Sequence, residues 1–206
     1  MKKLNLAILV AAMLMLVTAP VQADLFNFTS DHITGGYGSA GPFGSVLLTQ
    51  DGSDVDFVVT LNDASEFIRS GAGDGMNFKF NGTGVAVTDI SGTGLTAETG
   101  TFDGDGGGTF SFGVYFTGQQ NGGGAGIAGP IEFTVINATI ADFIIVNDKN
   151  QIFVADVISG LISPITGENN TGLIDVSAPV PEPISMLLFG TGLVGVGGYV
   201  RRKLKK

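Results

Sequence analysis

Apolar residues alternate with polar ones in several short segments of this chain, and a two-residue period is typical of half-buried β-strands. The clearest case is residues 109–116, where every second position is apolar: Phe110, Phe112, Val114 and Phe116. Residues 54–61 and 76–80 alternate in the same way, and the second segment stops at the turn-forming pair Asn81-Gly82. The pattern predicts antiparallel strands that turn one face toward a core rich in phenylalanine.

Four further segments read as strands: one beginning at Val85 and Val87, and those at 131–140, 143–146 and 152–157. Residues 147–150 would then form the loop of a hairpin between the last two. A helical period is missing, except for a short turn around 63–69. The many short strands separated by turn signals predict an all-β, antiparallel β-sandwich, either jelly-roll-like or immunoglobulin-like. A β-helix is the alternative, but no fixed short repeat supports it.

Glycine, cysteine and charge narrow the class of protein. Between residues 24 and 180, 28 of 157 residues are glycine, as tight turns between strands require, and the chain has no cysteine for disulfides or thiolate chemistry. The same span has three basic residues against 18 acidic ones, a formal net charge of −15. A surface of this charge repels nucleic acid and anionic lipid and attracts cations or basic partners.

The N-terminus has the three parts of a secretory signal peptide. Lys2 and Lys3 precede an apolar stretch from Leu4 to Val17, and small residues follow at Val21-Gln22-Ala23. We expect signal peptidase to cut between Ala23 and Asp24. An uncleaved anchor is the alternative, but the apolar stretch is shorter than the roughly 20 residues that a membrane span needs.

The C-terminus combines a short acidic motif, an apolar run and a basic end. Pro181-Glu182-Pro183 leads into 17 apolar or small residues from Ile184 to Val200. As a helix this run is about 25 Å long, at the short end of the spanning range. The basic residues that follow would stay in the cytoplasm: Arg201, Arg202, Lys203, Lys205 and Lys206. A buried core helix with a basic tail is the alternative.

In these residues the chain resembles the PEP-CTERM family of bacterial sorting signals. The resemblance covers only the C-terminal part, and it implies export in a Gram-negative bacterium and recognition by an exosortase. It further implies cleavage near Pro181-Glu182-Pro183 and delivery of the rest of the chain, the passenger, to the cell surface or to an extracellular polysaccharide matrix, as in biofilms. The passengers of this family are diverse, so the resemblance says nothing about the passenger's own activity.

These signals divide the chain into four parts. We expect a signal peptide at 1–23, a β-sandwich passenger at 24–162, a polar linker at 163–180 and a sorting signal at 181–206, with a single transmembrane helix at 184–200 and a basic tail at 201–206.

Asp103 and Asp105 stand in a glycine-rich stretch that resembles the start of a calcium-binding loop, because alternate oxygens on such a turn can surround a hard cation. The twelfth position of the loop is Val114, where an EF-hand has a bidentate Glu. An EF-hand is therefore excluded. A less regular calcium site at Asp103 and Asp105 stays open beside the simpler interpretation, a hairpin turn.

Catalytic constellations are not evident in the passenger. His32 is the only histidine of the chain and lies in a polar context, so we expect it on the surface and not in a Ser-His-Asp triad. We predict an exported, non-enzymatic surface or matrix protein without a required cofactor. Its partners would be signal peptidase, an exosortase, the membrane before processing and, in the matrix, polysaccharide. A calcium- or carbohydrate-binding module is the alternative, and an exported hydrolase ranks below it.

Overall fold

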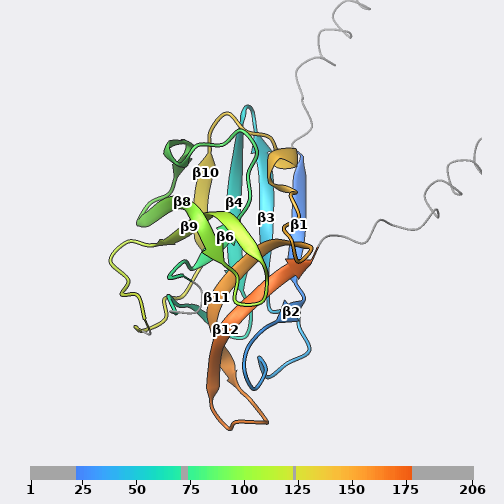
Figure 1. Ribbon diagram of the computed structural model, residues 1–206, viewed down its shortest axis with the longest axis vertical. Coiled ribbons are helices and arrows are strands. Elements are labelled where there is room, and N and C mark those ends of the chain that lie inside the picture. The colour runs from blue at the N-terminus through green and yellow to red at the C-terminus, as the bar shows by residue number, and fades with distance from the viewer. Residues whose placement is uncertain (1–21, 71–73, 123, 178–206) are drawn as a thin grey trace, which may run out of the picture.

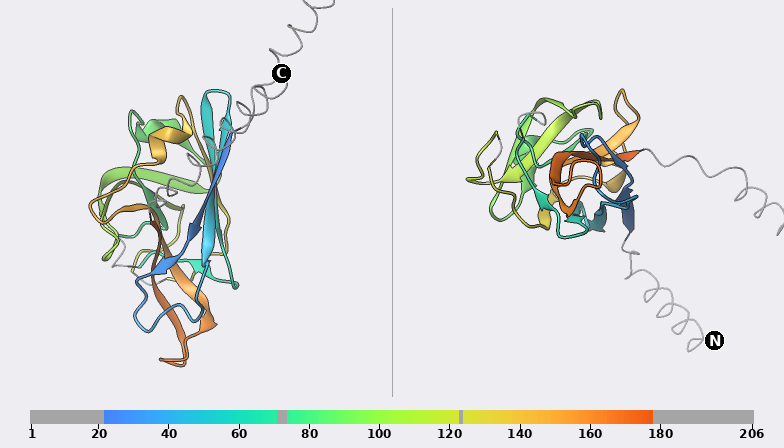
Figure 2. Two further views of the ribbon diagram at one scale, coloured as in Figure 1. Left: turned by 90° about the vertical axis from the view of Figure 1, so that its right-hand side faces the viewer. Right: turned by 90° about the horizontal axis from the view of Figure 1, so that it is seen from below.

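The computed structural model describes residues 22–70, 74–122 and 124–177. These residues form two antiparallel sheets packed face to face (Figures 1 and 2). The prediction of an all-β, antiparallel fold is confirmed. In the described ranges no helix is long and apolar enough to cross a membrane. The transmembrane helix expected at 184–200 and nearly all of the expected signal peptide lie outside these ranges.

The first sheet contains five strands in the order β1-β3-β4-β10-β7. Their bounds are Ala23–Phe28 for β1, Gly44–Asp51 for β3, Asp54–Leu61 for β4, Ile131–Val135 for β10 and Ile90–Ser91 for β7. β3 and β4 pair from Gly44 opposite Leu61 to Asp51 opposite Asp54 and so form a tight hairpin. β1 pairs with β3 on one side and forms one edge of this sheet.

The second sheet contains seven strands in the order β2-β12-β11-β6-β9-β8, with β5 pairing to β11 beside this path. Their bounds are Ser30–Asp31 for β2, Asn169–Ser177 for β12, Gln151–Ile162 for β11, Phe78–Phe80 for β6, Thr109–Phe116 for β9, Leu95–Asp103 for β8 and Glu66–Phe67 for β5. Only Thr29 separates β1 from β2, so the chain passes there from one sheet to the other.

Phenylalanine fills the space between the sheets. Phe57 of β4 lies at the centre, and its ring contacts five others, from both sheets and from one connecting segment: Phe78, Phe80, Phe133, Phe143 and Phe153. The ring of Phe133 is stacked on it at 4.5 Å between centroids. All six side chains are buried. The alternating phenylalanines of the sequence therefore form the core that they predict.

The strand predictions at 54–61 and 109–116 are confirmed as β4 and β9. The strand predicted at 131–140 ends at Val135 in β10, and two other strand predictions are wrong. Val87–Asp89 forms a 3-10 turn, because Asp89 accepts a hydrogen bond from the backbone N–H of Ala86 at 2.9 Å. Residues 143–146 are not a strand either: the 3-10 turn Ile140–Phe143 directs Phe143 into the core, and Ile144 and Val146 then face solvent.

The linker predicted at 163–180 is wrong over half of its length, because Asn169–Ser177 is β12. The segment looks polar at its start, but Leu173, Ile174 and Val176 are buried in the second sheet. β12 lies between β2 and β11, so the passenger extends at least to Ser177. The remaining residues 163–168 are the loop of the β11–β12 hairpin, which extends from the body of the molecule at the lower end in Figure 1.

Candidate functional site: a buried polar cluster on the second sheet

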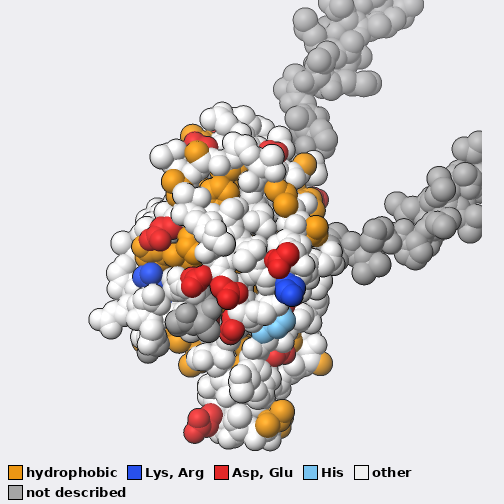
Figure 3. Space-filling model, in the orientation of Figure 1, with side chains coloured by type: hydrophobic (Ala, Val, Ile, Leu, Met, Phe, Trp, Pro, Cys, Tyr) orange, Lys and Arg blue, Asp and Glu red, His pale blue; other side chains and the backbone are white. Residues whose placement is uncertain are grey.

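Charged side chains lie on the outer face of the second sheet, the face turned away from the first. Alternation along β11 turns Phe153 toward the core and the next residue, Val154, outward. Val154 pairs with Lys79 of β6 on one side and with Asp175 of β12 on the other. These three residues form one row across the sheet, and Asp156 follows two positions along β11. In Figure 3, acidic side chains gather on this face around the only histidine.

Two chain segments cover this row and bury it. The turn at 104–108 between β8 and β9 lies over Val154, which packs with Phe110 and Leu173 in a small second core. Ser70 bonds Asp156, and Asp74 bonds the backbone of Asp103 next to that turn. Lys79, Asp156 and Asp175 consequently have no exposed surface, although Lys and Asp are rarely buried without partners. We call Lys79, Asp156, Asp175 and His32 the polar cluster.

The ammonium of Lys79 is bound by a carbonyl and not by a carboxylate. Its Nζ donates a hydrogen bond to the backbone oxygen of Asp103 at 2.8 Å. Burial lowers the pKa of Lys79 to about 8, and the negative charges of nearby aspartates, above all Asp156, oppose that shift. At neutral pH Lys79 therefore still carries a charge, which the surrounding carboxylates balance.

Asp156 is held by Ser70, whose backbone N–H and hydroxyl both donate to Oδ2 at 2.7 Å. Its other oxygen, Oδ1, is buried and has no hydrogen-bond partner in the described part of the chain. Burial raises the pKa of Asp156 to about 6; the bonds from Ser70 and the charge of Lys79 act in the opposite direction. Asp156 and Lys79 thus stabilise each other's charged form across neighbouring strands.

Asp103 and Asp105, the residues predicted for calcium, lie at the edge of this cluster. Asp103 ends β8, and its Oδ1 accepts a hydrogen bond from the backbone N–H of Asp105 at 2.9 Å. The backbone N–H of Asp103 donates to Asp74, and Gly104 and Gly108 close the turn with a 2.7 Å bond. The hairpin-turn interpretation is therefore confirmed. Among the described residues, no group of three or more acidic or histidine side chains could hold a metal ion, and calcium at Asp103 and Asp105 stays a prediction.

His32 is paired rather than simply solvated. Its Nε2 lies 2.6 Å from Oδ2 of Asp175, and about a third of the His32 side chain is exposed. Burial raises the pKa of Asp175, and the hydrogen bond to His32 opposes this. Within the described residues Asp175 is the only hydrogen-bond partner of the imidazole. The pair has the His-Asp part of a catalytic triad, but no hydroxyl of the described residues is bonded to the histidine to act as an activated nucleophile.

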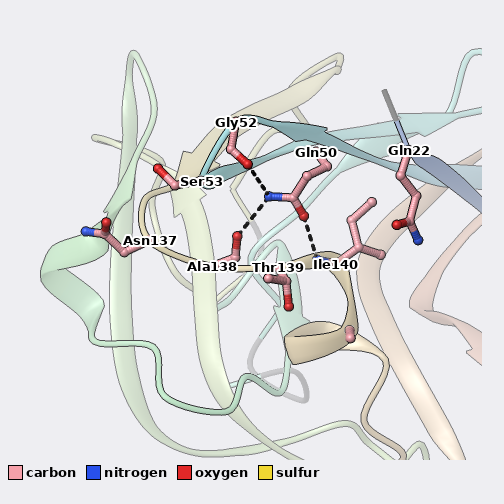
Figure 4. A pocket seen from close by; sticks show the side chains of 9 residues that line it. Gln22, Gln50, Gly52, Ser53, Asn137, Ala138, Thr139 and Ile140 are labelled. Atoms are coloured by element: carbon pink, nitrogen blue, oxygen red, sulfur yellow. Dashed lines mark hydrogen bonds between the residues drawn. The ribbon is translucent and has the colours of Figure 1, made fainter. Parts of the chain in front are cut away.

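A second polar feature is an open groove of about 630 Å³ at the end of the β3–β4 hairpin (Figure 4). Gln50 crosses it: Nε2 donates to the carbonyl oxygens of Asp54 and Ala138, both at 3.0 Å, and Oε1 accepts from the N–H of Ile140 at 3.1 Å. The amide of Gln50 therefore joins the hairpin to the segment that leads into the 3-10 turn. Because both atoms of this amide are already hydrogen-bonded, Gln50 has little capacity left to bind a ligand in the groove.

Of the two predicted processing sites, only the signal-peptidase site lies within the described residues. Ala23 begins β1 and is exposed, whereas Asp24 is half-buried. Pro181, Glu182 and Pro183 lie outside the described residues, as do Arg201, Arg202, Lys203, Lys205 and Lys206. The cleavage assignments at both ends stay predictions.

Sequence reasoning missed the polar cluster. The available signal was a single charge inside an apolar strand, as at Lys79 between Phe78 and Phe80, or at Asp156 between Ala155 and Val157. From alternation alone, one predicts that such a charged side chain faces solvent. It becomes a buried residue only because distant segments cover it, and the partners of Asp156 and Asp175 are 86 and 143 residues away in the chain.

Comparison with known families identifies the C-terminal segment. A family model for the PEP-CTERM protein-sorting motif matches residues 179–203, which include Pro181-Glu182-Pro183 and the first three residues of the basic tail. No curated protein and no solved structure matches the chain significantly.

The chain is thus a sorted, exported protein, with an antiparallel β-sandwich joined directly to a C-terminal sorting signal. That signal is the PEP-CTERM motif, which implies transient anchoring in a membrane and processing by an exosortase. The resemblance found in the sequence is confirmed for this segment. The motif begins two residues after the end of β12.

Proposed function

We propose that the passenger is a non-enzymatic domain that exosortase processing delivers to the cell surface or to an extracellular polysaccharide matrix. The observation that carries this proposal is the position of the sorting motif, which follows a compact sandwich after a single residue. The signal peptide predicted at 1–23, with cleavage after Ala23, would start the same export route in a Gram-negative bacterium.

The state of the polar side chains supports a structural or binding role. Lys79, Asp156 and Asp175 are covered by other parts of the chain, and the amide of Gln50 is used inside the domain. His32 is paired with a buried carboxylate and lacks a bonded hydroxyl in the described residues. A hydrolase needs a nucleophile or a pair of carboxylates that substrate can reach, and these groups do not supply one.

The net charge of −15 between residues 24 and 180 fits an extracellular location among hydrated polymers. Like-charged domains repel one another and stay soluble at high local concentration. Neutral or basic polysaccharide, or polymers bridged by cations, would be compatible partners, whereas nucleic acid would be repelled.

Replacing Pro181-Glu182-Pro183 by three alanines tests the sorting step. We expect the variant to accumulate in the membrane fraction at full tail length, while the parent protein leaves it. Intact mass of the parent protein outside the cell should show loss of the C-terminal residues. An extracellular form that still contains Arg201 to Lys206 would contradict processing by an exosortase.

A calcium-binding role is the second candidate, and one observation favours it: Asp74 joins Asp103 at the turn that the sequence singles out. Titration calorimetry with calcium chloride tests it, with Asp105→Asn as the variant and Asp63→Asn, on an exposed loop, as the control. Heat that Asp105→Asn abolishes and Asp63→Asn retains would support the site. Absence of heat with the parent protein would remove this candidate.

A further inference from the structure

The bond that signal peptidase is predicted to cut lies inside a β-ladder. It joins Ala23 to Asp24 at the start of β1, which forms an edge of the first sheet (Figure 1). Ala23 pairs with Thr49 of β3, and Asp24 pairs with Leu48. Both residues that flank the bond are therefore part of the first sheet.

The pairing continues upstream of the bond. The carbonyl oxygen of Gln22 accepts a hydrogen bond from the backbone N–H of Gln50 at 2.9 Å. Gln22 also lines the groove at the end of the β3–β4 hairpin (Figure 4). A cut after Ala23 would remove Gln22 and, with it, the acceptor of this N–H. The described domain thus contains residues that the mature chain would lose.

Downstream of the bond, two phenylalanines attach β1 to the core. Phe28 is buried, and the ring of Phe26 packs edge-on against Phe153 of β11 at 5.3 Å between centroids. An extended peptide is recognised largely through its main-chain hydrogen-bonding groups, and β3 already occupies those on one side of β1. Full access to the bond therefore requires β1 to leave β3 and Phe26 to leave Phe153.

We propose that the pairing of β1 with β3 protects the bond between Ala23 and Asp24, so that signal peptidase must cut it before the first sheet closes. Hydrolysis adds one water across this bond and leaves a carboxylate on Ala23 and an α-amino group on Asp24. Cleavage of a folded chain follows the fraction of molecules in which the segment is open, and the ladder and Phe26 keep this fraction small. The proposal rests on the cleavage after Ala23 that is part of the proposed function.

Purified signal peptidase and the full, uncleaved chain in detergent micelles test this order of events. The chain is added to the enzyme either after folding, which circular dichroism verifies, or directly from urea. Mass spectrometry at successive times gives the rate of the cut after Ala23. We expect the folded chain to be cut at least about tenfold more slowly than the chain taken from urea, because only its opened fraction is a substrate.

An insertion variant separates the position of the bond from its sequence. Six residues, Gly-Ser-Gly-Ser-Gly-Ser, are placed between Asp24 and Leu25, so that the bond and the residues before it stay intact but lie outside the ladder. After folding, this variant should be cut about as fast as the parent chain taken from urea. A folded insertion variant that resists the enzyme as the folded parent does would contradict protection by the ladder.

Two phenylalanine variants locate the protection within the domain. Phe26 and Phe116 are both partly buried against the core, but Phe116 lies in β9 of the other sheet. After folding, Phe26→Ala should be cut several-fold faster than the parent, whereas Phe116→Ala should be cut at the parent's rate. Equal acceleration by both substitutions would contradict protection that resides in β1.

The same measurements distinguish the proposal from the cleavage site on which it rests. A folded parent chain that is cut as fast as the chain taken from urea overturns the proposal and leaves the predicted site intact. If the chain taken from urea and the insertion variant are both left uncut after Ala23, the predicted site itself is wrong, and the proposal falls with it. Amide exchange at Gln50 in the folded, uncleaved chain should be slow, and exchange as fast as in urea would contradict the pairing.

Discussion

Phe57 has five ring partners among the described aromatic contacts, as many as Phe80, and it joins both sheets. We expect Phe57→Ala to lower the free energy of unfolding by about 3–5 kcal/mol, as large cavities in cores do. Urea denaturation followed by circular dichroism measures the change. Leu25→Ala, at an exposed position, is the control and should change it by less than about 0.5 kcal/mol. A similar loss in both variants would contradict a core centred on Phe57.

Lys79 and Asp156 make opposite contributions to stability as pH changes. The folded-state pKa of Asp156 is raised from 3.8 to about 6, so its favourable contribution is present at low pH and is lost as pH rises through this window. The folded-state pKa of Lys79 is lowered from 10.5 to about 8, so stability from this group increases between those values. At neutral pH both groups are charged and depend on each other.

Replacing Lys79 by Met removes a positive charge that lowers the pKa of Asp156, so at pH 7 the buried carboxylate either stays ionised without its partner or takes up a proton, and both cost stability. At pH 7 we expect a loss of about 3 kcal/mol, the usual result of breaking a buried charge pair. The loss should be smaller at pH 5, where Asp156 is protonated in the folded state. Urea denaturation at both pH values measures this. Lys149→Met is the exposed control, and adding Asp156→Asn to Lys79→Met should recover part of the stability at pH 7. A pH-independent loss would contradict the coupling.

At the scale of elements, Gln50 joins the β3–β4 hairpin to the segment at 137–140 through both atoms of its amide. Gln50→Leu leaves the carbonyl of Ala138 and the N–H of Ile140 without this partner. We expect a loss of about 1–3 kcal/mol and faster hydrogen exchange at Ile140. Exchange at residues of β11, such as Val154, is the internal reference. Unchanged exchange at Ile140 would show that the amide does not hold this segment.

Sequence patterns predict the strands in which apolar and polar residues alternate strictly, such as β4 and β9, because a strand with one buried face has an apolar residue at every second position. They fail at β12, where both faces are buried around Asp175 and the strand begins with polar residues. They also fail at 143–146, where Phe143 is buried in the core but Ile144 and Val146 are exposed. The polar cluster is not predictable from the pattern for the same reason: tertiary contacts decide whether Lys79 and Asp156 meet solvent, and the contact of Asp156 with Ser70 spans 86 residues.

At the scale of the whole molecule, the last strand of the passenger is an interior strand. β12 lies between β2 and β11, so without it β2 has no partner in the second sheet. We expect a chain that stops at Gly167 to lose its cooperative urea transition, whereas one that stops at Val180 keeps it. Far-ultraviolet circular dichroism follows the transition. Because the chain has no tryptophan, the near-ultraviolet signal of its phenylalanines gives a second measurement. A cooperative transition in the shorter chain would show that β12 is dispensable.

The pairing of β2 with β12 also determines when the second sheet can form during synthesis of the chain. Asp31 of β2 pairs with Ile174, so an early segment of the chain must wait for more than 140 later residues before it finds its partner. Contacts so distant in sequence form slowly. A nascent chain that cannot close its second sheet stays loose until residue 177 has been made. A translocation channel that accepts only unfolded polypeptide would be able to export the chain during the time before residue 177 is made.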